Sequence, residues 1–187
     1  CLLVDPGCYY LEEREELQSF LKEMELQPRM LLNTHCHLDH IFGNKFVAET
    51  YGLKPHIHRL EKAVHEYAPV SALMFNCPFD VYGGDFVFID EKTTLKLGDE
   101  ELKILFTPGH SPGSLSFYSA SHGFVLGGDV LFQQSIGRTD LPGGNLETLL
   151  ASIHKHFMTL PDETKVYSGH GPVTTIGQER KWNPFLQ

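Results

Sequence analysis

The sequence predicts an α+β fold in which helices cover the outer faces of two β-sheets. A helical stretch at 11–26, a short apolar strand at 30–33 and a second helical stretch at 44–51 follow one another, and such an alternation places helices on the faces of a sheet. Farther along, short strands separated by Gly, Asp or Pro turns are typical of a second sheet. These strands are expected at 86–89, 94–97, 102–106, 114–118 and 124–126.

Hydrophobic periodicity defines the outer helices. In 11–26 and again in 146–160, apolar residues recur at helical spacing, and in 11–26 Glu-rich residues occupy the opposite face. Asn145 directly precedes the second of these helices and is expected to act as its N-cap. The apolar positions are Leu17, Phe20, Leu21 and Met24 in the first helix and Leu146, Leu149, Leu150, Ile153 and Phe157 in the second.

The stretch 60–90 gives the weakest pattern. A helical start at 60–65 is expected to break at 67–69, where Pro69 stands, and the aromatic run at 72–79 has no clear period. Two interpretations stay open for this stretch: a lid over a substrate pocket, and packing in the core.

Composition limits the classes of function. With 187 residues, of which 41% are hydrophobic, the chain is expected to form a single domain over 1–187. A net charge of -9 argues against a nucleic-acid partner, and no run of Lys or Arg indicates a membrane surface. No apolar stretch approaches the roughly 20 residues of a membrane span. We expect a cytoplasmic protein, monomeric or homodimeric, that acts on a small molecule.

Three imidazoles and a carboxylate fall within residues 34–40. Because alternate residues of extended backbone face the same way, His35 and His37 are expected on one side, with Asp39 and His40 on the following turn. Neutral imidazole and carboxylate suit zinc and other first-row metals. Four donors this close together indicate one metal ion or two neighbouring ones.

Three later turns carry further candidate ligands, and each follows a predicted strand. His110 lies in the turn 107–113, Asp129 follows Gly127 and Gly128, and His170 lies in 168–172. Small residues beside each candidate let the backbone pass close to a metal or a substrate, and loops at strand ends often display chemistry.

Other Cys and His residues are expected to be structural. The four cysteines, Cys1, Cys8, Cys36 and Cys77, show no close paired spacing, which argues against a disulfide framework and a Cys-based zinc site. Cys36 should point away from its His neighbours by strand alternation and serve packing. The pair at 56–58 lacks the neighbouring carboxylate and third imidazole of 34–40.

These motifs, in this order, resemble those of the metallo-β-lactamase-fold hydrolases. Within them the chain is most similar to the single-domain relatives of glyoxalase II, the hydroxyacylglutathione hydrolases, and the resemblance runs over nearly the whole chain. It implies a metallo-β-lactamase-type αββα sandwich of two mixed sheets flanked by outer helices. The residues that carry it are the motif 35–40 with His110, Asp129 and His170, which is highly specific for the superfamily, and the stretch 137–140, which is specific for a branch of it.

The resemblance also implies a ligand set and a reaction. His35, His37 and His110 would hold one divalent metal ion, Asp39, His40 and His170 a second, and Asp129 would bridge them. Zinc is the expected metal, with iron or manganese as alternatives. A metal-bridging hydroxide would attack the carbonyl of a thioester such as S-lactoylglutathione, with Asp39 and Asp129 as catalytic residues.

Arg138 is the candidate substrate-binding residue. In glyoxalase II a basic residue at the matching place meets a glutathione carboxylate, a role that suits a guanidinium group. Gly171 and Pro172 depart from the family, since two-domain glyoxalase II enzymes have a Glu-Tyr pair there. The alternative function is a mononuclear iron persulfide dioxygenase, a class that shares the stretches at 33–37 and 137–140.

In that alternative, His35, His110 and Asp129 would form the two-His, one-carboxylate triad typical of iron oxygenases. The resemblance further implies that an Asp at the position of Asp5 supports the metal-binding loop from behind. The chain begins inside a predicted strand at 1–4. Since the family opens with an earlier hairpin, strands before this point are expected to be missing.

Overall fold

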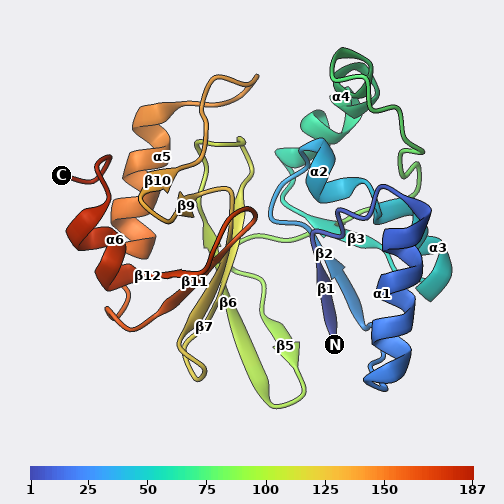
Figure 1. Cartoon of the computed structure of the whole chain (residues 1–187), viewed down its shortest axis with the longest axis horizontal. Helices are drawn as coiled ribbons and strands as arrows, with labels where there is room; N and C mark the ends of the chain where they lie inside the picture. The colour runs from blue at the N-terminus through green and yellow to red at the C-terminus, as the bar shows by residue number, and fades with distance from the viewer. The chain divides into compact units, whose positions relative to one another are not determined.

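The computed structural model describes every residue from Cys1 to Gln187, and the chain folds into two compact units, Cys1–Phe88 and Ile89–Gln187. Figure 1 shows that each unit has its own sheet and its own helices. The single domain predicted over 1–187 stays a prediction. None of the helices is both long enough and apolar enough to cross a membrane.

The first unit is built on a parallel sheet. Its strands, in order across the sheet, are β1 (Leu2–Val4), β2 (Met30–Leu32), β3 (Pro55–Ile57) and β4 (Val87–Phe88). Neighbouring strands run parallel, so each connection crosses over and carries helices. These helices are α1 (Leu11–Glu23), α2 (Leu38–Ile41), α3 (Asn44–Tyr51) and α4 (Glu61–Met74).

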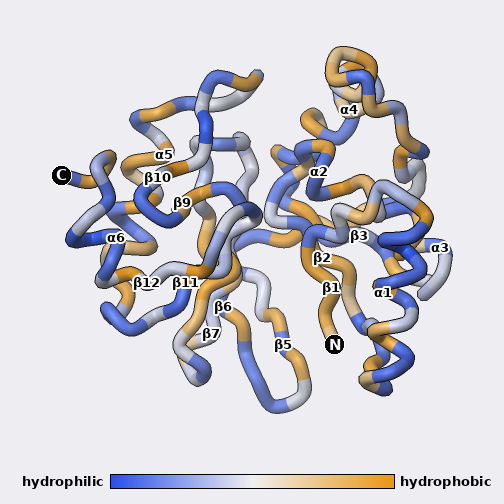
Figure 2. The backbone as a smooth tube through the Cα atoms, viewed as in Figure 1, coloured by the Kyte–Doolittle hydropathy of each residue, from blue (hydrophilic) through white to orange (hydrophobic).

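Strand β2 anchors the residues that follow it. Figure 2 shows β1 and β2 as hydrophobic stretches, and Leu31 and Leu32 of β2 are fully buried. Leu31 packs with Val47 and Ala48 of α3. The carboxyl end of β2 is therefore a rigid starting point for the His-rich segment.

Helix α4 corrects one expectation for the stretch 60–90. The predicted break at 67–69 is wrong, because α4 continues through Pro69 to Met74. Its buried residues recur at helical spacing and are Glu61, His65, Ala68 and Ala72. Proline removes one hydrogen bond from the helix, and burial of this stripe offsets that loss. The sequence reading missed the stripe because two of its members are a Glu and a His.

Strand β4 corrects a second expectation. The strand predicted at 86–89 exists as Val87–Phe88, but it pairs with β3 of the first sheet and not with the second sheet as predicted. Alternation along a chain identifies a strand but contains no information about its partner.

The second unit is built on a mixed sheet. Its strand order is β12-β11-β8-β7-β6-β5, and only β8 and β11 pair in parallel. These strands are β5 (Leu95–Leu97), β6 (Glu100–Phe106), β7 (Leu115–Ser119), β8 (Phe124–Gly128), β11 (Lys165–Ser168) and β12 (Thr174–Thr175). A separate short hairpin consists of β9 (Leu131–Phe132) and β10 (Ser135–Ile136).

Two helical segments supply the core of the second unit. Helix α5 (Leu146–Ser152) continues as a π-helical turn, Ile153–Phe157, and α6 (Ile176–Trp182) follows β12. The predicted N-cap is confirmed, since Asn145 Oδ1 accepts the N–H of Thr148 at 2.8 Å. Phe157 is fully buried in a cluster with residues of β6, β8, β11 and α6.

Replacement of Phe157 by Ala should lower the free energy of unfolding by about 3–5 kcal/mol, because it leaves a cavity in a closely packed core. Urea unfolding monitored by circular dichroism measures the loss. Leu146→Ala is the matched control, since Leu146 begins the same helical segment but is 50% exposed; it should cost roughly 0.5 kcal/mol or less. Equal losses in the two variants would contradict this assignment of the core.

Candidate metal centre

Three imidazoles of the first unit lie together directly after β2. The ring centroids of His35 and His37 are 4.7 Å apart, and those of His35 and His40 are 4.0 Å apart. Asp39 is exposed, with a carboxylate oxygen 3.7 Å from Nε2 of His40. Asp39 and His40 lie on the short helix α2, not on the predicted turn. We call residues 33–40 the His loop, and its four candidates the N-terminal ligand set.

Asp5, the residue directly after β1, supports the His loop. Its carboxylate accepts the backbone N–H of Thr34 at 2.7 Å, the Thr34 hydroxyl at 2.6 Å and Nδ1–H of His40 at 3.0 Å. Because the Thr34 hydroxyl donates to Asp5, its oxygen accepts from Nδ1–H of His35, 3.0 Å away. These bonds engage Nδ1 of both imidazoles, so Nε2 is the nitrogen that would bind a metal ion. The supporting role expected of Asp5 is confirmed.

Two buried asparagines join the start of the His loop to its end and to α3. Nδ2 of Asn33 donates to the backbone oxygen of His40 at 2.9 Å and to Asn44 Oδ1 at 3.2 Å, and Nδ2 of Asn44 donates back to Asn33 Oδ1 at 2.9 Å. The sequence reading missed both residues. A lone Asn carries no spacing signal, so only the fold identifies the pair.

Cys36 lies between two members of the ligand set but takes part in packing. It is 1% exposed and belongs to a hydrophobic cluster with Leu38, Ile41 and Ile57. Burial raises the pKa of its thiol well above the usual value, and the negative charges of Glu61 and Asp5 raise it further. The packing role predicted for Cys36 is therefore confirmed.

His56 is also structural, as predicted. Its Nδ1 lies 3.1 Å from the backbone oxygen of Leu31 and 2.9 Å from that of Lys54. The imidazole thus ties β3 to β2.

In the second unit, three candidate ligands follow three strand ends. Strand β6 runs antiparallel to β7, and β7 antiparallel to β8, so β6, β8 and β11 all point the same way. Their carboxyl ends meet at one edge of the sheet, just before His110, Asp129 and His170. We call these three residues the C-terminal ligand set.

One carboxylate oxygen faces both imidazoles of the C-terminal ligand set. Oδ2 of Asp129 lies 3.6 Å from Nε2 of His110 and 3.7 Å from Nε2 of His170. Both distances are too long for hydrogen bonds. Two donors that each lie about 2.1 Å from a tetrahedral ion are about 3.4 Å apart. The spacing therefore fits donors that share metal ions.

The segment after β10 fixes the orientation of His110. Nδ1–H of His110 donates to the backbone oxygen of Arg138 at 2.8 Å, so Nε2 faces Asp129. A Cβ atom on Gly137 would lie 2.0 Å from the backbone oxygen of Asp129 and 3.2 Å from Cβ of His110. Only glycine fits this place, so the stretch 137–140 packs directly on two candidate ligands.

The Arg138 side chain points into solvent and pairs with Asp140. Its Nε and Nη2 donate to the two carboxylate oxygens at 2.7 and 2.8 Å. This bidentate hydrogen bonding lowers the pKa of Asp140 to about 2. The substrate-binding role of Arg138 stays a prediction.

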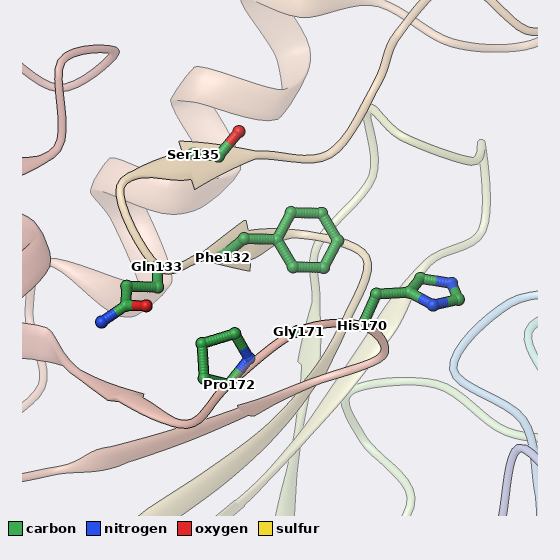
Figure 3. Close-up of a pocket in the computed structure, with 6 residues that line it drawn as sticks. All are labelled: Phe132, Gln133, Ser135, His170, Gly171 and Pro172. Atoms are coloured by element: carbon green, nitrogen blue, oxygen red, sulfur yellow. The ribbon is translucent and has the colours of Figure 1, made fainter.

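A pocket of about 240 Å³ opens beside His170, between the β9–β10 hairpin and residues 170–172. Figure 3 shows the Phe132 ring next to His170, and their ring centroids are 6.5 Å apart. The other lining residues are Gln133, Ser135, Gly171 and Pro172.

Helix α6 holds the hairpin wall of this pocket. The buried carboxylate of Glu179 accepts the backbone N–H of Gln134 at 2.7 Å and Nδ2–H of Asn183 at 2.9 Å. Asn183 also donates to the backbone oxygen of Ser135 at 2.9 Å. The sequence reading missed Glu179 and Asn183, which belong to no local motif.

The candidate ligands therefore fall into two sets, one in each unit. Within each set the predicted residues lie close together. Nδ1 of His35, His40 and His110 each makes a hydrogen bond to a supporting residue. That the two sets share metal ions stays a prediction.

Comparisons with known protein sequences all point to one family. A family model described as "Metallo-beta-lactamase superfamily" matches residues 1–170. The chain is 43% identical to the "Probable metallo-hydrolase YqgX" of Bacillus subtilis (strain 168) over 188 residues, which cover 100% of this chain and 87% of YqgX. It is 38% identical to the "Hydroxyacylglutathione hydrolase GloC" of Haemophilus influenzae over 186 residues, which cover 98% of this chain and 86% of GloC.

Comparison with solved structures supports the same fold. A structure titled "BLEG-1 B3 metallo-beta-lactamase" matches with a TM-score of 0.89 and 42% identity, covering 99% of this chain and 88% of that one. A structure of "TTHA1623 in a di-iron-bound form" matches with a TM-score of 0.88 and 35% identity, covering 97% of this chain and 87% of that one. These matches confirm the fold class predicted from the sequence.

The thiol of Cys36 should resist alkylation in the folded protein. The thiolate is the reactive form, so the raised pKa of Cys36 slows the reaction, and its burial keeps the reagent away. Iodoacetamide labelling followed by peptide mass spectrometry should find Cys36 at least roughly tenfold slower than the partly exposed Cys77, and equally reactive in urea. Labelling of Cys36 as fast as Cys77 in the folded state would contradict the packing role.

Proposed function

Because the chain belongs to the metallo-beta-lactamase superfamily, we propose that it is a dinuclear metal-dependent hydrolase that cleaves a thioester such as S-lactoylglutathione. The observation that carries this proposal is the position of Asp129, whose Oδ2 faces Nε2 of both His110 and His170 at 3.6 and 3.7 Å. The similarity to GloC, named a hydroxyacylglutathione hydrolase, supports the substrate class.

Membership of the superfamily implies binding of two divalent metal ions. We propose that His35, His37 and His110 hold one ion, that Asp39, His40 and His170 hold the other, and that Asp129 contacts both. Zinc suits this donor set. The di-iron-bound neighbour supports iron as an alternative, and manganese also accepts imidazole and carboxylate. Such a pair of ions lowers the pKa of a bound water and polarises a carbonyl group.

Residues around the proposed metal centre would hold its ligands in place and orient the attacking water. Asp5 and the Arg138 backbone oxygen fix His40 and His110 through their Nδ1 atoms, so that little rearrangement accompanies the reaction. Asp39 is nearly half exposed beside His40, and we propose that its carboxylate accepts a hydrogen bond from the attacking water. The leaving thiolate needs no general acid from the protein, because a thiol has a pKa of only about 8.5, so the sulfur leaves as an anion and takes its proton from solvent.

Arg138 is the proposed contact for a carboxylate of the substrate. Its guanidinium fork already binds the Asp140 carboxylate with two parallel hydrogen bonds, which is the geometry that a substrate carboxylate would adopt. Substrate binding would therefore exchange one carboxylate for another at an exposed site. The proposed partner is thus a small anionic thioester, and the cytoplasmic location and oligomeric state stay predictions.

Hydrolysis of a β-lactam is the second candidate function. It is favoured by the 42% identity to the structure named a B3 metallo-beta-lactamase, and it needs the same attack of an activated water on a carbonyl carbon. The persulfide dioxygenase predicted as an alternative would use only His35, His110 and Asp129. Because His37, Asp39, His40 and His170 are present as well, the chain has donors enough for either enzyme, and the dioxygenase stays the alternative that the sequence predicts.

The purified protein should release thiol from S-lactoylglutathione, measured with Ellman's reagent. Asp129→Ala should reduce kcat/KM by more than about 100-fold, because even residues that only support a metal ligand account for up to about that much. Asp99→Ala is the matched control, because Asp99 is an exposed carboxylate in a turn of the same unit, and it should keep full activity. Chelation should abolish turnover, and zinc should restore it.

The other candidates are tested on the same preparation with nitrocefin and with oxygen consumption on glutathione persulfide. Ring opening of nitrocefin without thioester cleavage would contradict the thioester as substrate and assign a β-lactam substrate to the protein. Oxygen uptake without hydrolysis of either substrate would overturn the proposal of a hydrolase.

A further inference from the structure

A buried carboxylate of α4 contacts the His loop. Glu61 lies in the first turn of α4 and is 0% exposed. Its Oε2 accepts the backbone N–H of Cys36 at 2.7 Å. Glutamate is seldom fully buried, because its charge loses hydration that only specific partners replace. The position of Glu61 therefore needs a structural or functional reason.

The bonded amide lies at the centre of the N-terminal ligand set. Cys36 lies between His35 and His37, and its N–H belongs to the peptide plane that joins His35 to Cys36, so the bond to Glu61 holds the backbone directly after His35 and one residue before His37. The His loop has left β2 by this point, since the strand ends at Leu32. No ladder hydrogen bond of the sheet is available to hold residue 36.

Bonds from three different elements replace the missing ladder. The backbone N–H of Asn33 donates to the backbone oxygen of His56 in β3 at 3.0 Å, that of Thr34 donates to Asp5 after β1 at 2.7 Å, and that of Cys36 donates to Glu61 in α4. Asp5 and Glu61 thus hold the loop at two points with carboxylates. Asp5 also places a carboxylate 3.0 Å from Nδ1 of His40, and negative charge beside the imidazoles favours a bound cation.

We propose that Glu61 is a positioning residue of the metal centre, which holds the Cys36 amide from α4, aims His35 and His37, and favours cation binding by its charge. This inference rests on the proposed function, because it needs a metal ion at the N-terminal ligand set. It also couples α4 to the metal. If metal binding strengthens the bond between Glu61 and Cys36, it must stabilise the first turn of α4 as well as the His loop.

The test measures zinc affinity and not activity. Zinc-loaded wild type, Glu61→Gln, Glu61→Ala and Glu66→Gln are titrated with a chromophoric chelator. Glu61→Gln keeps an acceptor oxygen but loses the charge and should bind zinc about tenfold more weakly, whereas Glu61→Ala loses both and should bind about 100-fold more weakly. Glu66 is an exposed glutamate of the same helix that pairs with Lys62, so Glu66→Gln should match the wild type.

Amide hydrogen exchange provides a second readout. In the wild type, zinc should slow exchange of the peptides that contain Cys36 and the first turn of α4, and this protection should shrink in Glu61→Gln. Circular dichroism and thermal unfolding identify any variant that fails to fold. If Glu61→Ala does not fold, the near-isosteric Glu61→Gln decides.

The outcomes separate the two proposals. Zinc affinity of the folded Glu61 variants within about threefold of the wild type, with unchanged protection, would overturn the positioning role and leave the hydrolase proposal intact. A wild-type protein that binds no divalent metal would overturn both. An equal loss in Glu66→Gln would assign the effect to the charge of α4 in general and would also overturn the specific role of Glu61.

Discussion

The structure depends most on the crowding of imidazoles and carboxylates that the backbone places at fixed points. In the second unit, the parallel directions of β6, β8 and β11 bring His110, Asp129 and His170 to one edge of the sheet, where one carboxylate oxygen faces two Nε2 atoms at 3.6 and 3.7 Å. Such an arrangement is too open for hydrogen bonds. It is a spacing that donors adopt around a common ion, and the proposed metal centre rests on it.

Much of the surrounding sequence serves to orient these donors. Asp5, Thr34 and the Arg138 backbone oxygen each accept from Nδ1 of an imidazole, and so direct its Nε2. Gly137 lacks the Cβ atom that would collide with Asp129. Glu61 holds the amide between His35 and His37 from a neighbouring helix. The same residues thus explain the shape of the fold near the site and the chemistry that we propose for it.

The sequence predicted the candidate ligands because their signal is local. Four donors within 34–40, and a His or Asp beside small residues at each of three strand ends, need no knowledge of the fold. Other features were out of reach. Glu61 and Glu179 act on backbone groups 25 and 45 residues away, a separation that leaves no periodic pattern. The continuation of α4 through Pro69 and the pairing of β4 with β3 depend on burial and on strand partners, which local propensity does not determine.

The most direct test of the account is the number of metal ions held by each chain at saturation. Protein loaded with excess zinc, freed of unbound metal and measured by mass spectrometry should contain about two ions per chain, the number expected of a two-metal site. The His170→Ala variant, which removes a proposed ligand of only one ion, should retain about one. A wild-type protein that holds a single ion or none at saturation would contradict the dinuclear centre on which the proposed hydrolysis depends.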